Sequence, residues 1–224
     1  EMVGDDGMVM TGMDLYSPMQ QVMRYHMGYM AFFYEIRDHP AKVERLFELE
    51  KELARKKLEI LADSPVEIPM LCANWTDDIH TPMFKDYFAP WLKEAAEFFH
   101  AKGKVVQVHT DGEMKRLIPH FLETGVDVAE AWSPAPMTSV STAELREAWG
   151  DKVTIWGGVP SIMFEPQYTD EEFDAYIMNM LEAVAPGDNF IVGMGDNLAS
   201  DGKIERVGRI AELIEKHGHM PIHV

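Results

Sequence analysis

Five short apolar runs along this chain each end in a polar cluster, and a helix-like stretch follows each one. The runs are residues 67–73, 104–108, 126–131, 153–156 and 189–194. Strands that alternate with helices predict an α/β fold with a parallel sheet. Such sheets carry their chemistry just past the carboxyl ends of the strands, so the polar clusters mark where a site is expected.

Two architectures have parallel strands of this kind. A doubly wound sheet shows a glycine-rich phosphate loop after a strand. The cluster Gly157-Gly158-Val159-Pro160 is too short for that loop, and its proline interferes with it. A (β/α)8 TIM barrel instead predicts polar residues at the ends of many strands, which is the pattern here.

The length of the chain limits how much of a barrel it can form. A whole barrel takes about 250 residues, whereas this chain has 224 and residues 1–66 supply little or no strand. We therefore expect one domain, residues 1–224, that holds the carboxyl-terminal five or so units of a barrel. The sheet edge left open should be covered by residues 1–38 or by a second chain, as in a homodimer.

Capping signals predict where the helices begin. Asp38-His39-Pro40 should open a long helix, with Asp38 or His39 as its cap. Ser141 with Glu144, and Thr169 with Glu172, are spaced as capping boxes. Further helices are expected at residues 19–36, from Thr81-Pro82 to Gly103 with a break at Pro90, at 113–123, and at 204–216.

Composition excludes several classes of protein. The net charge of −18 disfavours nucleic acid and acidic membrane surfaces as partners. No stretch is long and apolar enough to span a bilayer, and nothing resembles a signal peptide. The single cysteine, Cys72, lies in an apolar run and is expected to be buried and inert. These features favour a cytoplasmic protein that acts on a small molecule.

His109-Thr110-Asp111 is the most informative polar cluster. Residues i and i+2 of a strand point to one side, so an imidazole and a carboxylate converge there. Asp196 closes another strand, and His109, Asp111 and Asp196 are predicted to hold a divalent metal, zinc being one option. The alternative is that Asp111 caps the following helix and His109 makes a core hydrogen bond.

Two other clusters supply candidate residues. Asp77 and Asp78 follow the first run, where one carboxylate can act as an acid or base if burial raises its pKa. Adjacent carboxylates in a loop are otherwise simply solvated. Glu130 and Trp132 sit i and i+2 at another strand end, and Glu130 is either a partner that orients His109 or only a residue on the rim. Trp75 and Trp132 are predicted to line the substrate pocket.

In their order and spacing these segments resemble the uroporphyrinogen decarboxylase superfamily, which includes cobalamin-linked methyltransferases. The resemblance spans about residues 25–218. It is carried by Asp38-His39-Pro40, Trp75-Thr76-Asp77-Asp78 followed by Met83-Phe84-Lys85-Asp86-Tyr87-Phe88-Ala89-Pro90, Val108-His109-Thr110-Asp111-Gly112, Gly125-Val126-Asp127, Ile155-Trp156-Gly157-Gly158-Val159 and Phe190-Ile191-Val192-Gly193.

The resemblance implies a (β/α)8 barrel and a methyl group passed between a small substrate and a corrinoid on a partner protein. The methyltransferase branch looks like a zinc enzyme with a His-x-Cys pair and a later cysteine. His109 matches the histidine, but Asp111 and Asp196 stand where the cysteines would be. Two carboxylates make a harder site that favours oxygen over thiol chemistry. Decarboxylation of a tetrapyrrole-like acid and a non-catalytic binding domain remain the alternatives.

Overall fold

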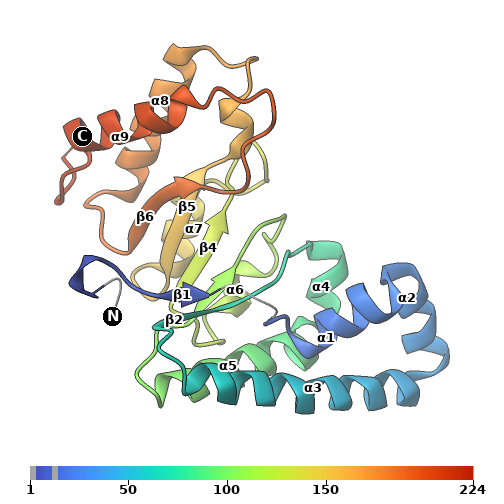
Figure 1. The fold of residues 1–224 in the computed structure, drawn as a ribbon. Coiled ribbons are helices and arrows are strands. Elements are labelled where there is room, and N and C mark those ends of the chain that lie inside the picture. Colours follow the sequence, from blue (N-terminus) through green and yellow to red (C-terminus); the bar gives the residue numbers. More distant parts are fainter. Residues whose placement is uncertain (1–3, 12–14, 224) are drawn as a thin grey trace. The chain divides into compact units, whose positions relative to one another are not determined.

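The computed structural model describes residues 4–11 and 15–223, and these residues form two compact units. Unit 1 comprises residues 1–73, 78–109 and 123–126, and unit 2 comprises residues 74–77, 110–122 and 127–224. Each unit is built on three parallel strands (Figure 1). Every predicted apolar run overlaps one of these strands, so the α/β prediction is confirmed.

Unit 1 contains strands β1 (Met10–Thr11), β2 (Ile68–Leu71) and β3 (Gln107–His109), in that order. Met10 pairs with Ile68, and Met70 pairs with Gln107, both in parallel register. Strand β1 shows that the first segment does supply one short strand, which the sequence did not predict. Cys72 follows β2 as a buried free cysteine, as expected. Residues 1–3 and 12–14 of the same segment lie outside the described residues.

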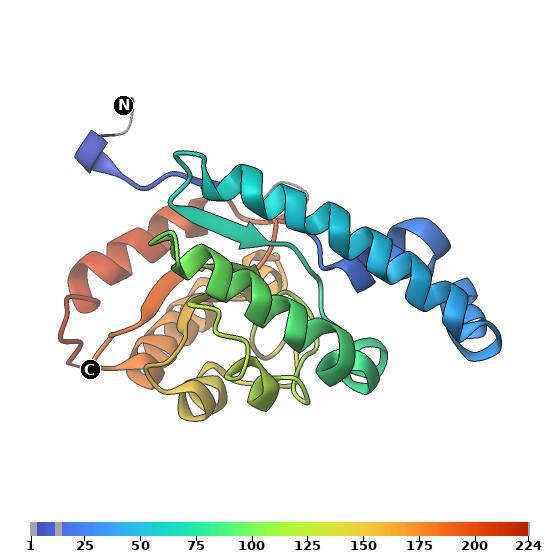
Figure 2. The same ribbon diagram turned by 90° about the horizontal axis from the view of Figure 1, so that it is seen from below.

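Three helices of unit 1 are long, and the others are short. The longest, α3 (Pro40–Ala62), begins at the predicted Pro40, but neither Asp38 nor His39 caps it through a side chain. Figure 2 shows α3 running alongside α5 (Ala89–His100), which begins at the predicted break near Pro90. The other elements are η1 (Gly4–Asp6), α1 (Pro18–Gln20), the π-helix η2 (Gln21–Met27), α2 (Tyr29–Asp38), α4 (Asp77–Met83) and the π-helix η3 (Phe84–Phe88).

Unit 2 contains strands β4 (Val128–Trp132), β5 (Thr154–Val159) and β6 (Phe190–Met194), in that order. Val128 pairs with Thr154, and Ile155 pairs with Phe190, again in parallel. An apolar core between β5 and the helices is built around Phe164, Phe173 and Ile177, all fully buried. This unit therefore has its own core, and the prediction of one domain over residues 1–224 stays a prediction.

The helices of unit 2 begin where the capping boxes place them. Ser141 caps α7 (Thr142–Trp149) and Thr169 caps α8 (Asp170–Val184), each with a reciprocal glutamate three residues on. Helix α9 (Glu205–His217) ends at Gly218. The remaining helical turns are α6 (Ile118–Phe121) and η4 (Ser161–Phe164).

Two predicted helices differ in extent from the observed ones. The helix expected at residues 113–123, with Pro119 bending or shortening it, is shortened to the four-residue α6, because Pro119 lies in its first turn and lacks the N–H that would extend a helix through it. The helix expected to start at Thr81-Pro82 starts at Asp77, and Pro82 lies inside α4. Of the helices among residues 4–11 and 15–223, none is long and apolar enough to cross a membrane.

Candidate functional site

The predicted site residues fall in both units. His109, the last residue of β3, and the exposed Asp78 belong to unit 1. The other six belong to unit 2, where they lie within the last residues of a strand or in the loops: Trp75, Asp77, Asp111, Glu130, Trp132 and Asp196. Most of the candidate residues therefore share one compact unit.

Residues 74–77 and 110–116 form a polar loop pair within unit 2. The Asn74 side-chain amide donates to Asp111 Oδ2 at 2.7 Å, and the Trp75 N–H donates to the Asp111 carbonyl at 2.8 Å. Gly112, at a φ of 116°, fits under Trp75 because a Cβ there would lie 2.0 Å from the Trp75 carbonyl oxygen. Asp111 thus joins the two loops instead of capping a helix through residues 113–123.

The Asp77 carboxylate has a structural role in the same pair of loops. It accepts the Arg116 N–H at 2.9 Å and 3.1 Å, and the Arg116 Nε lies 3.6 Å from its Oδ2. The residue is 8% exposed. A catalytic role for Asp77 stays a prediction, and its bonds show that it also shapes the loop.

Strand β4 is irregular at the predicted positions. Its register with β5 shifts between Ala129 and Trp132, and Ala131 adopts a φ of 62°. A left-handed alanine is a strained conformation that surrounding structure must hold in place. The Thr110 N–H and hydroxyl both donate to the Glu130 carbonyl at 2.7 Å. This irregularity breaks the alternation from which the pairing of Glu130 and Trp132 was predicted, and their roles stay predictions.

The ends of β4, β5 and β6 converge in what we call the glycine-packed strand ends, residues 130–133, 157–159 and 195. Gly157, at a φ of 143°, lies where a Cβ would be 2.4 Å from the Trp132 carbonyl oxygen. A Cβ on Gly195 would be 2.1 Å from Ser133 Oγ. The Gly195 N–H donates to the Val159 carbonyl at 2.9 Å. The absence of side chains at the glycines allows three strand ends to meet.

Two buried polar groups at the glycine-packed strand ends have no partner among the described residues. They are Trp132 Nε1 and Ser133 Oγ, in residues that are 0% and 1% exposed. Buried polar groups are nearly always hydrogen-bonded, and exceptions are found at functional sites or where water binds. Sequence reasoning assigned no role to Ser133, although it stands in the cluster that follows the third apolar run.

Tyr176 of α8 supports these strand ends from outside the sheet. Its hydroxyl lies 2.9 Å from the Gly158 carbonyl and 3.3 Å from the Ala135 carbonyl. Burial raises the pKa of the Tyr176 hydroxyl far above its usual range, so it stays a donor. A tyrosine on a helix face carries no sequence signal for this role, and sequence reasoning missed it.

Trp75, the other tryptophan predicted to line the pocket, and Asp196 lie in very different surroundings. Trp75 is 1% exposed and packs edge-to-face on Phe121, with ring centroids 5.3 Å apart, so it belongs to the core. Asp196 is exposed, and its Oδ1 accepts the Asn197 N–H. Across residues 4–11 and 15–223, no three His, Cys, Asp or Glu side chains gather closely enough to hold a metal ion. The metal site therefore stays a prediction.

Comparison with known proteins identifies the family. The chain matches the uroporphyrinogen decarboxylase family over residues 15–217, and so belongs to that family. No curated protein matches it in sequence.

Among solved structures, it is similar to a methyltransferase from Methanosarcina mazei, with a TM-score of 0.73 and 15% sequence identity. That match covers 96% of this chain and 60% of the methyltransferase. The chain thus spans less than two thirds of that protein. The prediction of a (β/α)8-type fold, present in part, is confirmed.

Proposed function

We propose that this chain contributes a substrate site of a methyltransferase that passes a methyl group between a small substrate and a corrinoid carried by another protein. The observation that carries the proposal is the convergence of β4, β5 and β6 on Ser133, beside the strained Ala131. Strain and unpaired buried donors are features of binding sites on barrel strand ends. The fold similarity to a methyltransferase supports the choice of reaction.

Within this proposal the residues of unit 2 have distinct tasks. Glu130, half-buried beside the bulge of β4, faces the substrate and orients it through its carboxylate. Trp132 supplies an apolar wall and a buried N–H donor. Asp77 and Asp78 remain candidates to move a proton, although the first also holds the Arg116 N–H. The corrinoid would supply the methyl-accepting centre when its carrier protein binds.

The direct test uses cob(I)alamin as a stand-in for the corrinoid protein and a panel of small methyl donors with methoxy or methylamino groups. Methyl transfer to cobalt converts cob(I)alamin to methylcobalamin and changes its absorbance. Glu130→Gln should slow the reaction or weaken substrate binding while the free energy of unfolding changes by less than about 0.5 kcal/mol. A large loss of stability with unchanged binding would give Glu130 a structural role instead.

Decarboxylation is the second candidate, because the matched family is described as uroporphyrinogen decarboxylase. The net charge of −18 argues against a substrate with many carboxylates. Incubation with uroporphyrinogen under anaerobic conditions should leave its carboxylates intact. Stepwise loss of carboxylates would replace the methyltransferase proposal with this one. Silence in both assays would favour a binding domain.

The metal prediction has its own test. Elemental analysis of protein purified without chelator should find about one divalent ion per chain if His109, Asp111 and Asp196 share it. The content should fall to background in His109→Ala and in Asp111→Ala. Metal-free protein whose melting temperature does not respond to added zinc or manganese would contradict the prediction.

A further inference from the structure

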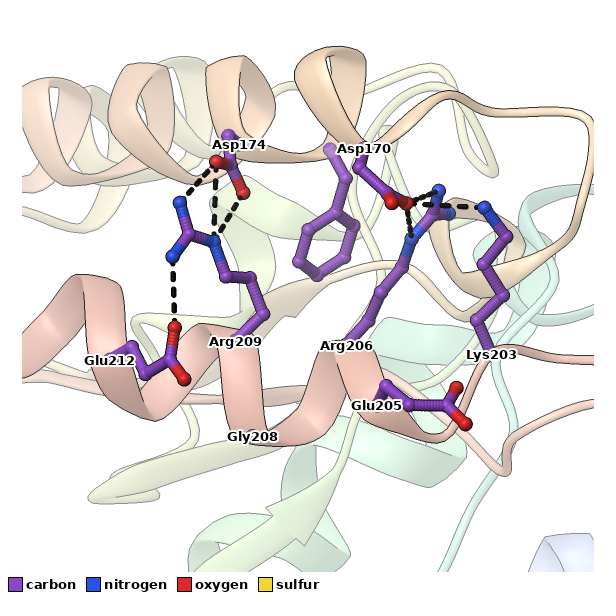
Figure 3. A pocket seen from close by; sticks show the side chains of 9 residues that line it. Asp170, Asp174, Lys203, Glu205, Arg206, Gly208, Arg209 and Glu212 are labelled. Atoms are coloured by element: carbon purple, nitrogen blue, oxygen red, sulfur yellow. Dashed lines mark hydrogen bonds and ion pairs between the residues drawn. The ribbon is translucent and has the colours of Figure 1, made fainter.

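Helices α8 and α9 enclose a charged groove of about 690 Å³ within unit 2 (Figure 3). None of the predicted site residues lines it. Its cationic side chains all have carboxylate partners: Lys203 and Arg206 pair with Asp170, and Arg209 pairs with Asp174 and Glu212. None of the three cations that line the groove is therefore free to bind an anionic ligand. One of them, Arg206, also binds backbone carbonyls of a neighbouring loop.

Arg206 is an arginine buried almost completely, with 3% of its surface exposed. Its Nη1 donates to the Met163 carbonyl at 2.6 Å, and its Nη2 donates to the Tyr168 carbonyl at 2.6 Å and to Asp170 Oδ1 at 2.8 Å. A further bond from Nη1 reaches the Glu165 carbonyl at 3.3 Å. The guanidinium therefore binds three carbonyls of one segment and the first residue of α8.

That segment is the β5–α8 loop, residues 160–169. It carries η4, whose Phe164 is fully buried and lies edge-on to Phe173, with ring centroids 5.5 Å apart. The Arg206 guanidinium lies over the ring of Phe173, 5.0 Å from its centroid. The Lys203 N–H adds a bond to the Phe164 carbonyl at 2.8 Å. The middle and the end of the loop are thus held by Lys203 and Arg206, just before and at the start of α9.

Arg209, one turn further along α9, provides a contrast. It donates to the carboxylates of Asp174 and Glu212, and its side chain is 44% exposed. It binds no loop carbonyl among the described residues. Solvent-exposed ion pairs contribute little to stability, whereas buried carbonyls need their donors. The same residue type therefore has two different roles on one helix.

The loop that Arg206 binds starts directly after β5. Pro160 follows Val159, whose carbonyl accepts the Gly195 N–H at the glycine-packed strand ends. The Ser161 hydroxyl also donates to Met137 Sδ, at 3.3 Å, in the segment after β4. Loops after barrel strands shape the substrate site. An arginine that fixes such a loop fixes one wall of the site.

We propose that Arg206 is a positioning residue: it holds the β5–α8 loop against the strand ends at which the substrate binds. The part of this inference that concerns the substrate rests on the proposed function. The part that concerns the loop does not, because it follows from the contacts of Arg206 alone. The planar fork of the guanidinium spreads five N–H donors over a wider span than the compact ammonium group, and here it serves three carbonyls and a carboxylate.

The test compares Arg206→Met, Arg206→Lys and the matched control Arg209→Met. Amide hydrogen exchange, read by mass spectrometry, should rise at least about tenfold over residues 161–170 in Arg206→Met, since buried carbonyls lose their donors. Arg206→Lys should also raise exchange in that segment. Arg209→Met should leave exchange there within about twofold of wild type. Unchanged exchange in Arg206→Met, or an equal rise in Arg209→Met, would overturn the loop assignment.

A second variant covers the case in which Arg206→Met fails to fold. Asp170→Asn keeps the guanidinium and its carbonyl bonds, and should raise exchange over residues 161–170 less than Arg206→Lys does. A larger rise in Asp170→Asn than in Arg206→Lys would show that the ion pair, not the carbonyl bonds, holds the loop.

Kinetics then separate positioning from the proposed function. In the cob(I)alamin assay, Arg206→Lys should raise KM for the small methyl donor more than it lowers kcat. A lower kcat with unchanged KM would overturn the role in substrate positioning. If wild-type protein transfers no methyl group, the proposed function is overturned, and the exchange experiment alone decides whether Arg206 fixes the loop.

Discussion

Two regions of unit 2 are held together in different ways. The polar loop pair, residues 74–77 and 110–116, is joined by side-chain bonds, such as Asn74 to Asp111 and Asp77 to the Arg116 N–H. The glycine-packed strand ends of β4, β5 and β6 are joined by close backbone contact at Gly157 and Gly195. Carboxylates are already hydrogen-bonded in the first region, whereas two buried donors in the second have no partner among the described residues.

This difference indicates in which region a ligand would form new hydrogen bonds without displacing existing ones. In the polar loop pair, a ligand would compete with bonds that Asp77 and Asp111 already make. At the glycine-packed strand ends, Ser133 Oγ and Trp132 Nε1 would gain a partner that they lack among the described residues. A bound substrate would therefore satisfy more unmet hydrogen-bonding capacity at Ser133 and Trp132 than at the carboxylates that the sequence motifs highlight.

The largest expected effect is on the glycine-packed strand ends. Gly157→Ala should lower the free energy of unfolding by about 3 kcal/mol, because its φ of 143° and the Trp132 carbonyl 2.4 Å from a Cβ exclude a side chain. The control is Gly208→Ala in α9, where a Cβ meets nothing within 4 Å. That change should raise stability by about 1 kcal/mol. Urea unfolding of both variants measures the difference, and similar stabilities would remove close packing as the organising feature.

A smaller effect is expected in the polar loop pair. Asp77→Ala should cost about 2 kcal/mol, because the part-buried Arg116 N–H loses its carboxylate acceptor. Asp77→Asn keeps an amide oxygen as acceptor and should cost less. Thermal unfolding compares the two variants. If Asp77→Asn is stable but inactive in methyl transfer, Asp77 has a catalytic role in addition to its bond; if both variants are as stable as wild type, the structural role is wrong.

Removing one hydroxyl from each region allows the two to be compared through changes of about 1 kcal/mol in the free energy of unfolding. The Thr110 hydroxyl donates to the Glu130 carbonyl at 2.7 Å, so Thr110→Val should destabilise the protein by about 1 kcal/mol. The Ser133 hydroxyl has no partner among the described residues, so Ser133→Ala should be neutral or stabilising by up to about 1 kcal/mol. Chemical denaturation of both variants tests this. Equal losses would mean that Ser133 is satisfied by bound water.

The smallest effect is a dependence on pH at the start of α7. Hydrogen bonds from the Ser141 N–H and hydroxyl lower the pKa of Glu144 below its usual 4.5. A lowered folded-state pKa means that the stabilisation is present above about pH 4.5 and is lost as pH falls through the lower folded-state value. The melting temperatures of wild type and Glu144→Gln should therefore differ at about pH 6, and the difference should shrink as the pH falls through the folded-state value. A difference that grows on acidification would contradict this assignment.

Local sequence signals predicted much of the fold. Apolar runs marked five strands because buried parallel strands are continuously apolar, and the capping boxes at Ser141 and Thr169 fixed two helix starts. Strand β1 was missed because two residues carry no periodicity. The start of α4 was misplaced because Pro82 gives a strong local signal that the surrounding packing overrides.

The candidate site was less predictable, because its features come from contacts distant in sequence. The alternation rule for Glu130 and Trp132 fails at a bulge that only pairing with β5 reveals. The tie from Asp77 to Arg116 joins residues 39 positions apart. Arg206 looks like any helical arginine in the sequence, and only the folded chain shows that it reaches 43 positions back to Met163.

The carbonyl bonds of Arg206 have a consequence for the ionic strength at which the protein can work. Dissolved salt weakens attraction between exposed charges, since the screening length shortens to about 3 Å at about 1 M salt. The Arg209–Asp174 pair is exposed in this way, whereas Arg206 is buried and, besides its pair with Asp170, binds three neutral carbonyls. Concentrated salt should therefore loosen the outer contact of α9 and the pair with Asp170, while the carbonyl bonds keep the β5–α8 loop in place, so that the shape of this loop depends little on the surrounding electrolyte.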